Sequence, residues 1–255
     1  MTEVLFFNKA SFFGIYLYNK YAEMKYNSFL LFVFLSFGFP ALYAQETLQP
    51  APAESKYLED QFYAGITYNL LLEMPEEVSQ NNFSNGFHLG FIKDIPVNTR
   101  RNTGFGIGLG YALNSYYSNL RAFEAGDAIH YEVIAPEITY KRNKIENHIV
   151  EMPVEFRWRT STKDIYKFWR IYTGVKLGYV FANVSKYIED AQKDKFSNPD
   201  IRKFQYGVYI SFGYNTWNFY ANYQLSPLLE KDVVTTTGEA IQMRALRIGL
   251  NFYIL

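Results

Sequence analysis

Ile149-Val-Glu-Met-Pro-Val-Glu-Phe-Arg-Trp-Arg159 is the stretch of this 255-residue chain that decides its fold. Every second side chain from Val150 to Trp158 is apolar, whereas the positions between them are mostly charged. Successive side chains of a β-strand point to opposite faces, so this spacing gives one apolar face and one charged face. The stretch therefore predicts a β-strand whose two faces lie in very different environments.

The same alternation occurs in Phe62–Leu70, Phe87–Phe91, Gly104–Asn114, Phe168–Ala182, Phe204–Phe212, Trp217–Leu225 and Leu246–Ile254. The apolar faces are rich in aromatic residues, and the opposite faces hold glycine, asparagine and scattered charges. The interior of a soluble barrel or sandwich packs aliphatic side chains and excludes charge. In a membrane barrel the apolar face contacts lipid, and small or polar side chains fill the lumen. We therefore predict an all-β fold, an eight-stranded antiparallel transmembrane β-barrel.

The connections between these strands alternate in length. The connections after the second, fourth and sixth strands have roughly 10, 7 and 4 residues, and the others have roughly 14 to 30. Outer-membrane barrels place their short turns in the periplasm. This parity predicts an outer-membrane barrel whose N- and C-termini are periplasmic. Residues 121–146 are ambiguous, because Ile129–Lys141 could form a strand. We expect an extension of that hairpin outside the membrane, and a ten-stranded barrel is the alternative.

The N-terminal part of the chain has the pattern of a secretory signal. Lys25 precedes an apolar run over Phe29–Phe39, and small residues then lead to a cleavage site between Ala44 and Gln45. The apolar run is too short to cross a bilayer alone. A cleaved signal peptide is therefore favoured over a retained membrane anchor.

Two methionines, Met1 and Met24, are candidate starts. The charged end of a signal normally stands at the terminus, which favours Met24 and would make residues 1–23 an extension without structural meaning. We assign residues 1–44 to this extension and the signal peptide. Residues 45–59, rich in Pro, Ala, Gln and Glu, are expected to be a flexible periplasmic linker, and residues 60–255 the barrel.

The composition excludes several classes of function. The 25 basic and 25 acidic residues balance, whereas a nucleic-acid binder needs a basic face. The chain has no cysteine, which excludes disulfides, zinc–thiolate sites and cysteine nucleophiles. The three histidines lie on separate segments, and the sequence has neither a nucleophile motif nor a dinucleotide-binding glycine loop. We expect no catalytic, cofactor-binding or metal site.

A charge network is expected in the lumen, formed by Glu151, Glu155, Arg157, Arg170, Lys176 and Arg247. An eight-stranded lumen is just wide enough for side chains to fill it, and buried charges must be paired. Four residues along a strand separate Glu151 from Glu155 by about 13 Å, which is farther than the carboxylates of a hydrolytic pair. We therefore expect a structural network rather than a catalytic pair or a proton relay.

The segment Asn183–Ile201 mixes lysines with acidic residues. We expect it to be solvated surface. Contact with the phosphates of lipopolysaccharide is disfavoured by its mixed sign.

The chain ends in an alternating strand with a polar residue, a glycine and two apolar residues two positions apart, Arg247, Gly249, Phe252 and Ile254. This pattern resembles the C-terminal assembly signal of outer-membrane barrels. It implies that the barrel assembly machinery is a partner.

Five stretches resemble the PorT family of Bacteroidetes: Asp60–Gly65, Pro96–Asn102, Pro153–Ser161, Tyr166–Gly174 and Ile248–Leu255. The resemblance covers essentially all of residues 60–255. The runs Glu-Phe-Arg-Trp-Arg-Thr-Ser and Lys-Phe-Trp-Arg-Ile-Tyr are its most specific parts.

This resemblance implies a non-enzymatic outer-membrane component of the type IX secretion system, which exports proteins with a C-terminal sorting domain and is often linked to gliding motility. The implied partners are outer-membrane lipid and other secretion components, with no nucleic acid. The alternative is a small porin-like or ligand-binding outer-membrane protein. A membrane-embedded enzyme would need a clustered catalytic set, which the sequence does not show.

Overall fold

The computed structural model describes residues 60–126, 128–160 and 168–254, and the chain forms β-strands and no helix there. In these ranges, therefore, no helix is long and apolar enough to cross a membrane. The strands are β1 (Gln61–Leu72), β2 (Asn85–Pro96), β3 (Thr103–Tyr117), β4 (Leu120–Ala125), β5 (Ala128–Val133), β6 (Arg142–Arg159), β7 (Trp169–Ile188), β8 (Lys193–Phe196), β9 (Phe204–Tyr214), β10 (Trp217–Gln224) and β11 (Arg244–Ile254).

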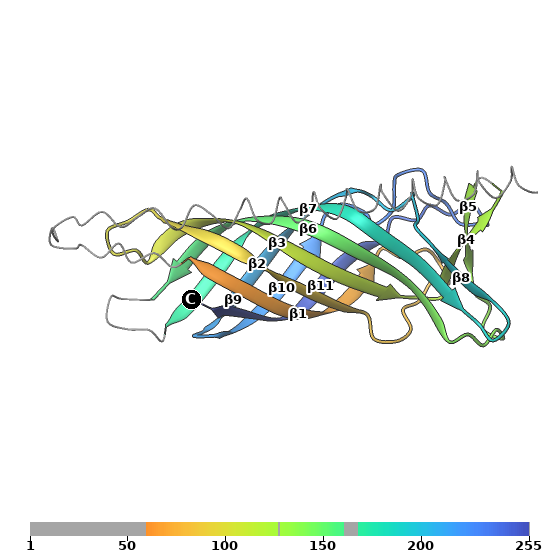
Figure 1. Cartoon of the computed structure of the whole chain (residues 1–255), viewed down its shortest axis with the longest axis horizontal. Helices are drawn as coiled ribbons and strands as arrows, with labels where there is room; N and C mark the ends of the chain where they lie inside the picture. Colours follow the sequence, from red (N-terminus) through yellow and green to blue (C-terminus); the bar gives the residue numbers. More distant parts are fainter. Residues whose placement is uncertain (1–59, 127, 161–167, 255) are drawn as a thin grey trace, which may run out of the picture. The chain divides into compact units, whose positions relative to one another are not determined.

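Eight of these strands close into a barrel (Figure 1). The pairings run β1–β2–β3–β6–β7–β9–β10–β11 and return to β1, and each is antiparallel. The predicted eight-stranded barrel is confirmed. A ten-stranded barrel is wrong, because β4 and β5 form a separate two-stranded sheet and β8 pairs with the far end of β7. The expected hairpin extension between β3 and β6 is the β4–β5 hairpin.

The two faces of the barrel wall are divided as the alternation predicts. Phe204 is 72% exposed on the outside, while the next residue, Gln205, is 5% exposed and points inward. The outer face carries most of the large exposed apolar side chains, such as those of Phe62 and Trp169. The inner face holds buried polar and charged side chains. A soluble protein places these residue classes the other way round, so the barrel is built for a lipid surrounding.

Two strands are much longer than a membrane crossing requires. β6 has 18 residues and β7 has 20, whereas a crossing strand needs about 9–11. The two strands stay paired up to Arg142 and Ile188, past a register shift between His148 and Ile149. The sequence predicts a start of β6 at Ile149, which is wrong, because the earlier residues lie beyond the lipid and need no apolar outer face.

The connections fall into two groups, one at each end of the barrel. β2, β6 and β9 end at the end of the barrel where β1 begins and β11 ends, and we call this the short-turn end. The four longer connections lie at the opposite end, the long-loop end. The predicted alternation of connection lengths is therefore confirmed.

A hydrophobic core closes the long-loop end. This core joins side chains from the barrel strands near the long-loop end to others from the loops and the β4–β5 hairpin. Among them are Leu71, Tyr116, Leu120, Tyr131, Ile201, Leu228, Leu229, Ile241 and Met243. The loops at this end are thus a packed cap rather than an open vestibule.

Candidate functional site

The lumen gathers the charged side chains that the barrel buries. Each barrel strand contributes alternate residues to it, and the buried charged residues among them are Asp94, Glu151, Glu155, Arg157, Arg159, Arg170, Lys176 and Arg247. Burying a charge is costly unless it is paired and hydrogen-bonded. The contacts of these residues therefore decide what the lumen can do.

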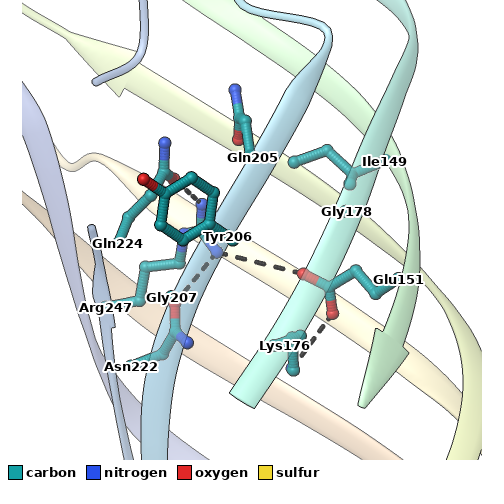
Figure 2. A pocket seen from close by; sticks show the side chains of 10 residues that line it. All are labelled: Ile149, Glu151, Lys176, Gly178, Gln205, Tyr206, Gly207, Asn222, Gln224 and Arg247. Atoms are coloured by element: carbon teal, nitrogen blue, oxygen red, sulfur yellow. Dashed lines mark hydrogen bonds and ion pairs between the residues drawn. The ribbon is translucent and has the colours of Figure 1, made fainter. Parts of the chain in front are cut away.

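One cluster lies midway along the lumen (Figure 2). Lys176 Nζ lies 3.0 Å from Glu151 Oε2 and donates to the hydroxyl of Tyr220 at 2.8 Å. Arg247 lies 3.9 Å from the other carboxylate oxygen of Glu151 and donates to Asn222 Oδ1 at 3.1 Å. Glu151 thus contacts both cations, one on β7 and one on β11.

The space between these side chains is small. The cavity lined by Glu151, Lys176 and Arg247 has a volume of about 20 Å³, enough for roughly one water molecule. Figure 2 shows the side chains converging from several strands on this space. The cavity has no room for a substrate or for a passing polypeptide.

A second cluster lies nearer the short-turn end. Arg157 donates to Glu155 at 2.8 Å, to Asp94 at 2.9 Å and to the Gln61 side-chain oxygen at 2.6 Å. Arg159 donates to both carboxylate oxygens of Asp94, at 3.0 and 2.8 Å. Glu155 also accepts a hydrogen bond from the Tyr209 hydroxyl. The two arginines are thus held by carboxylates from two strands.

The six predicted network residues are all buried in the lumen, but they do not form one group. Glu151, Lys176 and Arg247 form the midway cluster, and Glu155 and Arg157 belong to the second. Arg170 packs against aromatic rings instead, with its guanidinium 4.5 Å from the ring centre of Phe168 and 5.3 Å from that of Tyr253. Glu151 and Glu155 therefore have different partners and are not arranged as an acid–base pair.

Sequence reasoning missed Asp94, and it noted Arg159 without assigning it a partner. The predicted strand ends at Phe91, whereas β2 continues to Pro96. The inward alternation through His88 and Ile92 was the signal that could have found Asp94.

Large side chains fill the rest of the lumen where glycines leave space. A Cβ at Gly110 would lie 2.2 Å from the Tyr63 hydroxyl, and one at Gly106 would lie 2.8 Å from Ile92 Cγ2. Both distances are far below van der Waals contact. The small residues of β3 therefore accommodate bulky side chains from β1 and β2.

The three histidines lie in different parts of the molecule and have different neighbours. His88 lies in the lumen near Asn251 at 3.3 Å, and His148 bonds to the Tyr111 hydroxyl at 2.7 Å on the outer side. His130 lies on β5 with its ring stacked on Phe123. In the part of the chain that the structure describes, no group of three or more His, Asp or Glu residues could hold a metal ion.

The residues of the C-terminal assembly signal lie on β11, which pairs with both β1 and β10. Arg247 points into the lumen, and Ile254 is exposed on the outside at the short-turn end. Gly249 is tightly confined, because a Cβ there would lie 1.9 Å from the carbonyl oxygen of Ile66. The signal peptide, its cleavage site at Ala44 and Gln45, and the linker over 45–59 lie outside the described residues.

Comparison with known proteins gives a family and a set of distant structures. A family model described as "Outer membrane protein beta-barrel domain" matches residues 43–228. No curated protein matches the chain.

Two similar solved structures are of Ail, the attachment invasion locus protein of Yersinia pestis. The structure of its complex with the heparin analogue sucrose octasulfate is 13% identical, covers 77% of this chain and 99% of Ail, and has a TM-score of 0.36. The other is 14% identical, covers 76% of this chain and 97% of Ail, and has a TM-score of 0.34.

Proposed function

This chain belongs to the outer membrane protein beta-barrel domain family, and from that premise we propose that it is a non-enzymatic component of the type IX protein secretion system. The protein lies in the outer membrane. In the proposed arrangement its short-turn end faces the periplasm, and its long-loop end faces the cell exterior. Its role is to support the export of proteins with C-terminal sorting domains, and gliding motility where the two are linked.

The observation that carries this proposal is where the PorT-like stretches lie. Four of them meet at the short-turn end: Asp60–Gly65, Pro96–Asn102, and the described parts of Pro153–Ser161 and Tyr166–Gly174. The described part of the fifth stretch, residues 248–254, forms most of β11, which ends there.

Direct contacts join these stretches to one another. Arg157 donates to Gln61, and its guanidinium lies 4.5 Å from the ring centre of Tyr172. Arg159 Nε donates to the carbonyl oxygen of Arg101 at 2.8 Å. The resemblance is therefore carried by one connected substructure rather than by scattered residues, which supports a shared role for this end of the barrel.

Because the lumen is filled, we infer that the protein assists export and does not itself conduct the exported proteins. Arg157 and Tyr172 are fully buried across the short-turn half, and the core of the cap closes the other end. Exported proteins could not pass through such a barrel. The proposed component therefore acts through its surfaces, alongside other secretion components in the membrane.

One observation favours a second candidate, a ligand-binding outer-membrane protein. A surface hollow of about 410 Å³ lies at the long-loop end, lined in part by Tyr131, Asp200 and Asp232. Tyr131 donates to Asp200 at 3.0 Å, so this hollow has ordered polar walls. The lumen itself does not favour the porin-like form of this alternative.

A clean deletion tests the secretion proposal. We expect proteins with C-terminal sorting domains to leave the culture medium and accumulate in the periplasm, as measured by the proteomes of the two fractions. A copy that starts at Met24 should restore secretion. A copy that lacks Arg244–Leu255 should not, because the loss of β11 opens the barrel between β1 and β10. An undiminished set of secreted proteins in the deletion strain would overturn the proposal.

A further inference from the structure

The charges of residues 183–201 are mixed along the sequence, but the structure sorts them by face. β6, β7 and β8 continue beyond the barrel as one sheet, and β3 stays paired with β6 in it as far as Lys144. In its register Lys144 lies opposite Lys186, which lies opposite Lys195. In the next row, Arg142 and Lys193 flank Ile188.

Residues that lie directly opposite one another on paired strands share a face of the sheet. The two rows therefore place five cations on one surface, which we call the basic face: Arg142, Lys144, Lys186, Lys193 and Lys195. Like charges directly opposite are destabilising. Burial, together with the other four cations of the basic face, holds the pKa of Lys186 below its usual value.

Most of the acidic residues of this extension are engaged away from the basic face. Asp194 lies opposite Tyr187 on the other face and accepts a hydrogen bond from Arg121 at 2.8 Å. Glu189 accepts one from the Tyr187 hydroxyl at 2.8 Å. Asp190, at the tip of the loop, pairs with Lys141.

Glu146 is the acidic residue on the same side of β6 as the basic face. It is bonded to Lys144 and, at 2.8 Å, to Ser115. One carboxylate therefore stands against five cations, and the face is left with a positive excess. The mixed sign along the sequence therefore does not describe this face, because the alternation of the strands separates the signs.

The basic face looks outward and lies just above the lipid-facing wall. Trp158 lies at the short-turn end of β6, and His148 lies farther along the same strand. The number of residues between them is about what a membrane crossing needs. His148 bonds to Tyr111, and the ring of Phe181 lies 6.1 Å from that of His148, a grouping typical of an aromatic belt at the membrane interface. Lys144 follows four residues beyond His148, about 13 Å along the strand.

The position of the basic face above the apolar belt, and its outward orientation, decide what it can bind. A soluble anion could approach from any side, whereas lipid headgroups surround the barrel at the level where its apolar belt ends. Long lysine side chains above an apolar surface reach toward the headgroups with their ammonium groups. Basic clusters next to a membrane surface are attracted to anionic headgroups.

We propose that the basic face binds the phosphate groups of a phosphorylated glycolipid in the outer leaflet of the outer membrane, through Lys144, Lys186 and Lys195 with Arg142 and Lys193 beside them. Bound lipid relieves the repulsion between the facing cations and fixes the depth at which the long-loop end stands above the membrane. This inference does not depend on a role in secretion.

The test is lipid binding by the full folded chain in a zwitterionic detergent. Native mass spectrometry with added bisphosphorylated lipid A measures the bound lipid. We expect wild-type protein to retain lipid A, and the variant Lys186→Gln/Lys195→Gln to bind it at least tenfold more weakly. The matched control is Lys203→Gln/Lys231→Gln, which removes two exposed lysines outside the basic face and should bind as wild type does.

Two further arms identify the source of the phosphate. Wild-type protein should bind dephosphorylated lipid A no better than the Lys186→Gln/Lys195→Gln variant binds intact lipid A. Raised salt should weaken the binding of lipid A to wild type, because it screens the charges. Equal binding of lipid A by wild type and the Lys186→Gln/Lys195→Gln variant would overturn the proposal. So would undiminished binding of dephosphorylated lipid A. Tight binding of soluble hexametaphosphate that displaces lipid A would also overturn it, because the face would then be a site for soluble polyanions. The compact electrophoretic mobility of unheated samples checks that each variant is folded.

Discussion

At the scale of single residues, the lumen depends on a few buried ion pairs. Glu151 and Lys176 lie on paired strands, and both side chains are almost fully buried. A buried pair of this kind adds little net stability, because desolvation offsets most of the attraction. Removing one partner is different, since it leaves an uncompensated charge with almost no water around it.

We expect Glu151→Gln to lower the free energy of unfolding by about 3–5 kcal/mol, the usual cost of breaking a buried pair. The double variant Glu151→Gln/Lys176→Met should lose less than the single variant, because it leaves no unpaired ammonium group. Urea unfolding of the protein in lipid vesicles, followed by tryptophan fluorescence, measures both.

The control is a largely exposed pair at the long-loop end, Lys141 and Asp190. Asp190→Asn should cause no measurable change, because solvent screens such pairs. The single variant Lys176→Met completes the comparison. If the double variant loses as much stability as Glu151→Gln and Lys176→Met lose together, Glu151 and Lys176 do not interact.

The sequence predicts which residues share the lumen but not which of them touch. Alternation places Glu151, Glu155 and Arg157 on the inner face without knowledge of the neighbouring strands. Their partners depend on register across the barrel, as when Asp94 on β2 meets Arg157 on β6. Register follows from packing and barrel closure, which a single sequence pattern does not contain.

At the scale of strands and hairpins, the barrel and its outer additions obey different rules. The strands that cross the membrane need an apolar outer face, so alternation reveals them. Beyond the lipid this constraint ends, and β4, β8 and the part of β6 before His148 carry polar residues on both faces. This is why the sequence predicts the eight barrel strands and leaves the extensions unresolved.

The β4–β5 hairpin should be removable without loss of the barrel. We expect replacement of Leu120–Val133 by a short Gly-Ser linker to leave the closed ring intact, because β4 and β5 pair with each other and not with a barrel strand. The variant should unfold at a lower temperature, since Leu120, Ala122 and Tyr131 leave the core of the cap.

Electrophoretic mobility of unheated and heated samples measures both effects, because a folded membrane barrel runs as a compact band until it is heated. The copy without β11 serves as the unfolded reference. Absence of the compact band from the hairpin variant would contradict the assignment of β4–β5 as an addition to a barrel that is complete without it.

At the scale of the whole molecule, the account describes a closed barrel that is filled rather than hollow. Two charged clusters occupy the lumen, large side chains such as Tyr63 lie over its glycines, and a hydrophobic core closes the long-loop end. Its surfaces carry the proposed contacts: the short-turn end toward the secretion components, and the basic face toward lipid.

The most direct test of this account is electrical recording of the purified barrel in a planar lipid bilayer. A filled lumen predicts no discrete current steps at any applied voltage, either for wild type or for the variant without the β4–β5 hairpin, because the charged clusters remain in place when the cap is loosened. Protein-free bilayers give the baseline, and electrophoretic mobility confirms that the inserted protein is folded. Uniform current steps from wild-type protein, increasing in number with the amount inserted, would contradict the filled barrel and favour a porin-like channel.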